Sequence, residues 1–162
     1  MEHPIKLLIV DDETRFLKAI ATRLRKRGFD VRTAGDGPEA LALARQEKFD
    51  IALLDLKMPG MDGGQVLQRL KLEHRFLEAV ILTGHGSLES AVQLTKLGAF
   101  SYLPKPYELD KLIETLKDAY QARLKKKFAA DEARMKRILA AEHSESPLAI
   151  LRSLQELDDG ER

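Results

Sequence analysis

The chain has 162 residues, of which 44% are hydrophobic, so it can bury one substantial core and has little room for two. It contains no cysteine, which excludes disulfides, thiol redox chemistry and cysteine-ligated zinc sites. The formal net charge of +1 argues against nucleic-acid binding through bulk positive charge. Neither a signal peptide nor a membrane-spanning apolar run is recognisable, so we expect a cytoplasmic protein without membrane association.

Segments with little alternation of apolar and polar residues predict strands that are buried on both faces. Such segments occur at residues 5–10, 29–34, 50–55, 79–84 and 100–105. Between and after them, apolar residues at helical spacing predict helices near residues 16–24, 40–44, 66–70, 88–95 and 109–116. Gly28 and Gly98 stand where left-handed caps would end two of these helices. The alternation predicts a doubly wound α/β fold with a five-stranded parallel sheet, and a site at the C-terminal ends of its strands.

Polar residues follow the apolar part of four predicted strands. In chain order they are Asp11 and Asp12, Asp55, Thr83, and Lys105. Neighbouring parallel strands end at the same edge of a sheet, so these side chains should converge. Close carboxylates repel one another by roughly 4 kcal/mol per pair at an effective dielectric of about 20. A hard divalent cation relieves this repulsion, and the set therefore predicts a site for Mg²⁺ and phosphate.

Four motifs occur in order at these strand ends. They are Asp11-Asp12, LLDLKMPGMDG around Asp55, LTGHGS around Thr83 and YLPKP around Lys105. Together they resemble the receiver domain of two-component response regulators, over residues 5 to about 122, and most of all receivers of the nitrogen-regulation type. The resemblance implies a flavodoxin-like receiver domain at residues 1–122 and leaves a helical C-terminal extension at residues 123–162.

The resemblance implies a role for each acid. Asp55 would be the phosphoacceptor, and Asp11, Asp12, Asp55 and the backbone carbonyl of Lys57 would hold Mg²⁺. In such a site a carboxylate attacks the incoming phosphoryl group, and nearby positive charge neutralises the equatorial oxygens. The protein contributes mainly positioning and electrostatic stabilisation.

The resemblance also implies roles for polar and aromatic neighbours. Lys105 and Thr83 would bind the phosphoryl oxygens, and Thr83 and Tyr102 would form the switch that reports phosphorylation. Lys57 and His85 would modulate the attack of water on the acyl phosphate, with intermediate to slow self-dephosphorylation expected. Ordinary roles remain open: Thr83 as a β-branched strand residue, Tyr102 as a partly exposed strand tyrosine, and the other two as solvated side chains.

The acids and the lysine have structural alternatives as well. One of the acids at residues 11–13 could cap the following helix, and Asp55 could be a turn residue at the end of a strand. The joint presence of these acids with Lys105 favours the functional interpretation. Prolines flank Lys105, and the resemblance favours a cis Lys105–Pro106 bond.

A long helix is expected after the predicted domain. Residues 108–143 contain no Pro or Gly and are rich in good helix formers, so one helix should continue to near Glu142. Its apolar positions step by three and four, although Asp131 interrupts the stripe and no clean heptad persists. These positions are Ile113, Leu116, Tyr120, Leu124, Phe128, Met135, Ile138 and Leu139. Coiled-coil dimerisation is thus compatible with the pattern without being required by it.

A break is predicted at residues 143–147, where Ser146 would cap a short amphipathic helix with Pro147 at its first position. Leu148, Leu151 and Leu154 form an apolar ridge on that helix, which we expect to be buried. Residues 121–137 carry seven Lys or Arg against two acids, and residues 138–162 carry two against six. This asymmetry favours a dimer or a folded-back tail, and a weakly ordered solvated tail is the alternative.

We predict a phosphorylation-controlled response regulator that receives a phosphoryl group on Asp55 from a sensor histidine kinase. Phosphorylation would change a partner or dimer surface on the fourth helix, fifth strand and fifth helix, around Leu94, Tyr102 and Lys111. The helical tail would be the output or dimerisation element. Direct DNA binding is not expected, because the residues after Ala122 are too few for a separate DNA-binding core.

Two other functions are compatible with the same residues. The chain could be a phosphate sink or shuttle without an output of its own. It could also be an aspartyl-phosphate hydrolase, but such haloacid-dehalogenase-like enzymes carry the nucleophile of a DxD motif on the first strand, whereas this chain has Asp11-Asp12-Glu13 there. We therefore expect a regulator with Mg²⁺-dependent self-phosphorylation and self-dephosphorylation, not an enzyme in the usual sense.

Overall fold

The computed structural model describes residues 3–84, 88–141, 151–152 and 154–156. The chain divides into two compact units, Met1–Arg123 and Leu124–Arg162. The elements in chain order are β1 Lys6–Val10, α1 Thr14–Lys26, β2 Asp30–Ala34, α2 Gly37–Gln46, β3 Ile51–Asp55, α3 Gly63–Glu73, β4 Glu78–Thr83, α4 Leu88–Lys96, β5 Ser101–Pro104 and α5 Leu109–Ala141. This alternation confirms the predicted α/β fold. Among these residues, no helix combines the length and the apolar character that crossing a membrane requires.

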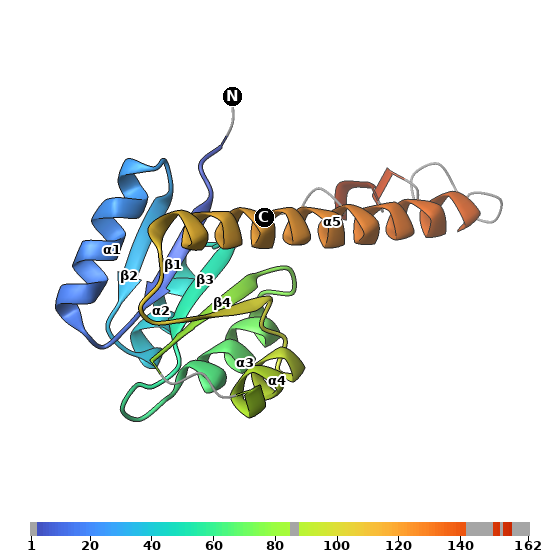
Figure 1. The fold of residues 1–162 in the computed structure, drawn as a ribbon. Coiled ribbons are helices and arrows are strands. Elements are labelled where there is room, and N and C mark those ends of the chain that lie inside the picture. The colour runs from blue at the N-terminus through green and yellow to red at the C-terminus, as the bar shows by residue number, and fades with distance from the viewer. Residues whose placement is uncertain (1–2, 85–87, 142–150, 153, 157–162) are drawn as a thin grey trace. The chain divides into compact units, whose positions relative to one another are not determined.

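The described strands form a five-stranded parallel sheet in the order β2-β1-β3-β4-β5 (Figure 1). Val10 of β1 pairs with Ala34 of β2 on one side and with Leu54 of β3 on the other. The chain therefore adds β2 on one side of β1 and the later strands on the other side, and the order of strands reverses between β1 and β3. Every residue of β3 and β4 is buried, as continuous apolar runs predict for strands that are covered on both faces. Ligands of such sheets bind beyond the C-terminal ends of the strands at this reversal point.

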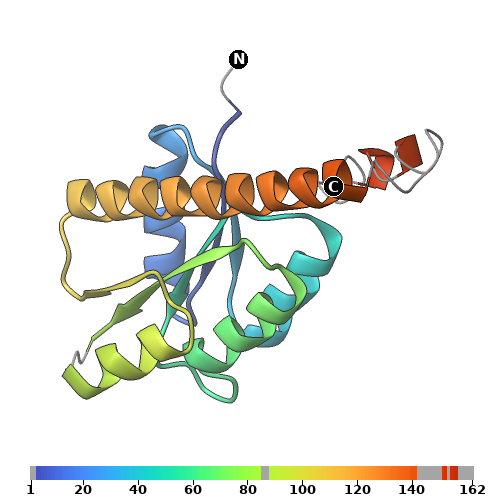
Figure 2. The same ribbon diagram turned by 90° about the vertical axis from the view of Figure 1, so that its right-hand side faces the viewer.

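Helices cover both faces of the sheet. One core cluster joins α2, α3 and α4 to one face, and a second joins α1 and α5 to the other. Figure 2 shows α5 along one side of the sheet and α3 and α4 along the opposite side. Leu8 and Leu54 belong to the first cluster, whereas Leu7 and Leu53 belong to the second, because successive strand side chains point to opposite faces.

The helix ends follow the local sequence. Gly28 and Gly98 have φ angles of 94° and 101°, which confirms the predicted left-handed caps after α1 and α4. Asp36 accepts a hydrogen bond from the Glu39 N–H at the start of α2. Asp62 forms a capping box with Gln65 at the start of α3. That cap places α3 directly after the loop that leaves the end of β3.

The helix α5 continues without interruption through its 33 residues, Leu109–Ala141. This confirms the predicted long helix as far as Ala141. Glu142, Ser146, Pro147 and Leu148 lie outside the described residues, so the predicted break and cap cannot be compared with the structure. The helix starts in the first unit and passes into the second, whose first residue is Leu124.

One expectation about apolar side chains is wrong, and another stays a prediction. Leu94 was placed on a partner surface, but it is only 5% exposed and packs in the core beneath α4. Leu151 and Leu154 are 57% and 37% exposed in the single chain, so burial of their ridge against a second copy stays a prediction. The spacing of apolar residues identifies one face of a helix without identifying what covers that face.

Candidate functional site

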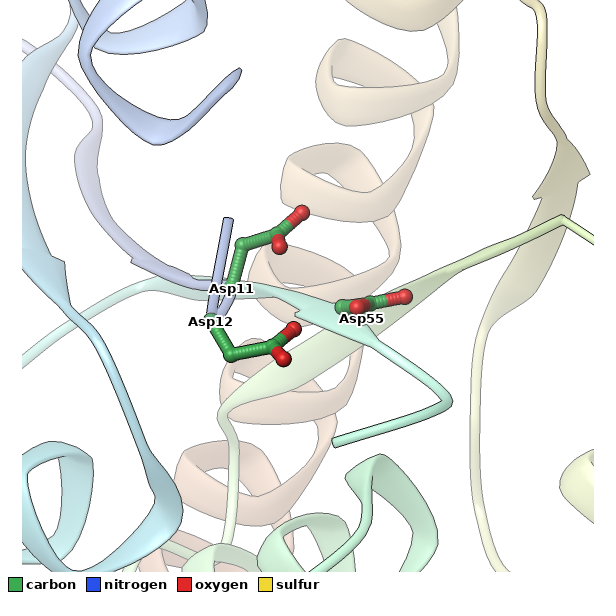
Figure 3. A group of neighbouring side chains, drawn as sticks. All are labelled: Asp11, Asp12 and Asp55. Atoms are coloured by element: carbon green, nitrogen blue, oxygen red, sulfur yellow. The ribbon is translucent and has the colours of Figure 1, made fainter. Parts of the chain in front are cut away.

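The acids at the strand ends form one cluster. Asp11 follows β1 directly, and Asp55 is the last residue of β3, which pairs with β1 up to Val10 and Leu54. Oxygens of Asp11, Asp12 and Asp55, one from each carboxylate, lie within 4.8 Å of one another (Figure 3). Asp11 and Asp55 are buried, whereas Asp12 is exposed. We call these three residues the acidic cluster.

Asp11 has both a local and a long-range contact. Its Oδ1 accepts a hydrogen bond from the Glu13 N–H at 2.9 Å, which orders the turn into α1. Glu13 occupies the N-cap position, and its side chain makes no capping hydrogen bond. Asp11 Oδ2 accepts a hydrogen bond from Lys105 Nζ at 3.3 Å. Asp11 therefore orders the turn before α1 and contacts Lys105, and the N-cap residue itself makes no side-chain cap.

Lys105 reaches the acidic cluster from the end of β5. Its Nζ lies 3.7 Å from Asp55 Oδ1, in addition to the 3.3 Å contact with Asp11. The Lys105 N–H donates a 2.7 Å hydrogen bond to the Thr83 carbonyl, which ties the segment after β5 to the end of β4. The Lys105–Pro106 peptide bond is cis, as the resemblance implied. One ammonium thus lies within 4 Å of two of the three carboxylates.

The environment of Asp55 disfavours its charged form. Burial, and then the negative charge of Asp11, raise the pKa of Asp55 from 3.8 to about 6. The ammonium of Lys105 acts in the opposite direction, as does a hydrogen bond from the backbone of Lys57. The single ammonium of Lys105 does not offset burial and the neighbouring negative charges, so an additional cation would be stabilised at Asp55.

The other predicted site residues differ in how far they are buried. Thr83 is buried at the end of β4, one residue beyond Leu82, which pairs with Asp55. Tyr102 is half-buried on β5 and packs against the core cluster on the α2, α3 and α4 face. The side chain of Lys57 is exposed just after β3. His85 lies outside the described residues.

Two aromatic residues at the site were missed as functional candidates. Lys105 Nζ lies 4.4 Å from the centroid of the Phe16 ring. The Phe16 ring meets Tyr107 edge-on, with centroids 6.2 Å apart. Burial, and then the charge of Asp11, raise the pKa of Tyr107 to about 12. The sequence marks Phe16 only as an apolar helix position, and only the position of Tyr107 two residues after Lys105 points towards the site.

A family model described as the response regulator receiver domain matches residues 7–117. The chain belongs to this family. Residues 7–117 are thus a receiver domain of two-component response regulators, as the four motifs predicted. The acidic cluster, Lys105 and Thr83 all lie within the matched residues.

The receiver is similar to parts of longer proteins and to whole solved domains. It is 39% identical over 122 residues to the transcriptional regulatory protein GlrR of Escherichia coli (strain K12), covering 75% of this chain and 28% of that protein. It is 36% identical over 117 residues to a putative response regulator NtrX-like of Rickettsia bellii (strain RML369-C), covering 71% and 24%. A CheY-like receiver domain of Methanospirillum hungatei JF-1 superposes with a TM-score of 0.72 at 31% identity, covering 76% of this chain and 99% of that one. The chain therefore spans only about a quarter of these curated relatives.

Proposed function

We propose that residues 1–122 accept a phosphoryl group on Asp55 from a sensor histidine kinase, and that residues 123–162 form a helical extension. The observation that carries this proposal is the convergence of three carboxylates and one ammonium at the reversal point of the sheet. A donor kinase that uses ATP works in the cytoplasm, and we place the receiver there as well.

The residues present fit a bound Mg²⁺. Three carboxylates offer oxygens within 4.8 Å of one another, and burial beside Asp11 raises the pKa of Asp55 to about 6. Asp11, Asp12, Asp55 and the backbone carbonyl of Lys57 would hold the ion. When bound, Mg²⁺ would supply positive charge that binds phosphoryl oxygens and keeps the carboxylates ionised.

Asp55, Lys105 and Thr83 would each have a different role in phosphoryl transfer. A carboxylate oxygen of Asp55 forms a bond to phosphorus as the bond from phosphorus to the kinase imidazole nitrogen breaks, and that nitrogen leaves with its electron pair. Lys105, 3.7 Å from Asp55 Oδ1, donates hydrogen bonds to the equatorial oxygens without giving up a proton. Thr83, at the end of the adjacent strand, binds one of the same oxygens through its hydroxyl.

Movement of Thr83 towards the phosphoryl group would open space behind it, into which Tyr102 would rotate. Tyr102 already lies half-buried on β5, so its rotation would change the surface formed by α4, β5 and α5. This is a population shift between two packings, with a coupling of about 1–3 kcal/mol. Lys57 and His85 would set how readily water reaches the acyl phosphate.

We also propose that the helical extension associates with a second copy of the chain. Leu124, Phe128, Met135 and Leu139 are 43%, 71%, 41% and 53% exposed. Leu124, Phe128, Met135 and Ile138, with Asp131 in line, are separated by steps of four, three, four and three residues. These steps are compatible with a short coiled-coil seam that Asp131 interrupts.

Phosphorylation by acetyl phosphate tests the central proposal. Treatment of the full chain with acetyl phosphate and Mg²⁺ should add one phosphoryl group to Asp55, measured by intact mass and peptide mapping. Asp55→Asn should abolish the addition, whereas Asp118→Asn, an exposed acid on α5, should leave it unchanged. Equal labelling of the Asp55 variant would contradict the assignment.

A further inference from the structure

The Lys105 ammonium lies between the acidic cluster and an aromatic ring. Its Nζ is 3.3 Å from Asp11 Oδ2, 3.7 Å from Asp55 Oδ1 and 4.4 Å from the centroid of the Phe16 ring. Cation–π attraction acts within about 6 Å of a ring centroid, so this contact is well inside its range. The ammonium is therefore attracted by two carboxylates and by a ring face.

The Phe16 ring is itself held in place. It belongs to the first turn of α1, is half-buried and packs against the core cluster beneath α1 and α5. The Tyr107 ring meets it at an interplanar angle of 85°. Such edge-to-face contacts are favourable, because the positive edge of one ring meets the negative face of the other. The helix α1 and the segment before α5 thus support Phe16 from two elements.

We propose that Phe16 is a positioning residue for phosphoryl transfer, whose ring keeps the Lys105 ammonium at the acidic cluster. The proposal rests on the proposed function of Asp55 as phosphoacceptor. The Lys105 side chain is 22% exposed and has a long flexible stem, so it can also extend into solvent. Attraction to a fixed ring favours the Lys105 conformers in which the ammonium faces Asp55. A larger fraction of the molecules then has the arrangement that phosphoryl transfer requires.

Replacement of the ring should slow phosphorylation without abolishing it. With acetyl phosphate and saturating Mg²⁺, Phe16→Leu should lower the rate of phosphoryl addition to Asp55 by roughly two- to tenfold, as expected for loss of one cation–π contact. Phe16→Tyr, which keeps the ring, should retain the rate. Incorporation of 3,4,5-trifluorophenylalanine at position 16 keeps the shape of the ring but weakens its negative face, so it should slow the reaction as Leu does.

A spectroscopic readout separates positioning from packing. The Lys105 ε-methylene protons should show upfield ring-current shifts with Phe or Tyr at position 16 and lose them with Leu. Tyr120→Leu is the matched control, because Tyr120 is also half-buried against the same core cluster and lies on α5 outside the site. This control should phosphorylate at the unaltered rate.

The outcomes are distinguishable. A trifluorophenylalanine variant that is phosphorylated on Asp55 at the unaltered rate would overturn the positioning role and leave the phosphoacceptor assignment intact. The same conclusion would follow if Phe16→Leu and Tyr120→Leu slowed the reaction equally. Failure of the unaltered chain to gain any phosphoryl group on Asp55 would overturn the proposed function, and the positioning role with it.

Discussion

Asp55 destabilises the fold when it is ionised, because only 7% of the residue is exposed and Asp11 lies beside it. Its folded pKa is about 6 against an ordinary value of 3.8. Between these values the folded chain binds more protons than the unfolded chain, so stability falls as pH rises through this interval. The cost is absent below about pH 3, where both states are protonated, and is fully developed above about pH 7.

We therefore expect Asp55→Asn to stabilise the metal-free chain at pH 8, by about 1–3 kcal/mol, since one pKa unit corresponds to about 1.4 kcal/mol. The gain should be much smaller at pH 4 and approach zero below about pH 3. Urea unfolding at both pH values measures it, with Asp118→Asn as the control for removing an exposed acid. Added Mg²⁺ should stabilise the unaltered chain more than the Asp55 variant. A gain that is independent of pH would contradict the assigned cause.

Asp12 should affect the metal site more than the fold, because it is the exposed member of the acidic cluster. We expect Asp12→Ala to weaken Mg²⁺ binding by at least about tenfold, since it removes one of few anionic ligands. Calorimetric titration measures the affinity. Glu13→Ala removes the neighbouring exposed acid, which is not in the cluster, and should bind Mg²⁺ nearly as well as the unaltered chain. If both substitutions weakened Mg²⁺ binding equally, Asp12 would act only through its negative charge and would not be a metal ligand.

At the scale of the elements, α5 is attached to the sheet at the edge opposite the acidic cluster. Arg123 Nε donates a 3.0 Å hydrogen bond to Asp50 Oδ1, just before β3. Asp50 Oδ2 accepts a second hydrogen bond, from the Lys6 N–H at the start of β1. The Arg123 and Asp50 side chains are only 16% and 22% exposed, so water screens this ion pair less than a surface pair.

A double-mutant cycle on Asp50 and Arg123, with Ala at each position, should therefore yield a coupling of about 1 kcal/mol. The matched pair is Arg27 and Asp110, which are 51% and 86% exposed and 3.5 Å apart. Its coupling should be within about 0.5 kcal/mol of zero. Urea unfolding of the unaltered chain and the six variants supplies both values, and equal couplings for the two pairs would refute the role of burial.

For the whole molecule, the exposed stripe on the helical extension should determine the assembly state. Burial of each large apolar side chain against a second copy contributes up to about 1.5–3 kcal/mol. Phe128 is 71% exposed, so Phe128→Lys should shift a dimer towards monomer in sedimentation experiments on the full chain. Leu72→Lys, at an 84% exposed position on α3, should leave the assembly unchanged. A monomeric unaltered chain would remove the dimerisation role of the extension.

The order of strands and helices could be predicted from the sequence alone, because each depends on local periodicity. Buried strands such as residues 51–55 are apolar throughout, and Gly28 and Gly98 end helices where only a residue without Cβ turns easily. The strand-end positions of Asp11, Asp55 and Lys105 also follow from the pattern, since parallel strands end at one edge.

Tertiary structure decided the contacts that join distant segments. Phe16 lies against Lys105 only because α1 and the end of β5 meet at the site, and an apolar position in a helix does not show which cation it will face. The raised pKa of Asp55 likewise depends on burial by the packed sheet and on the neighbouring Asp11. Leu94 is buried because the core beneath α4 covers it. Periodicity determines which face of an element is apolar, whereas packing across the fold determines what that face meets.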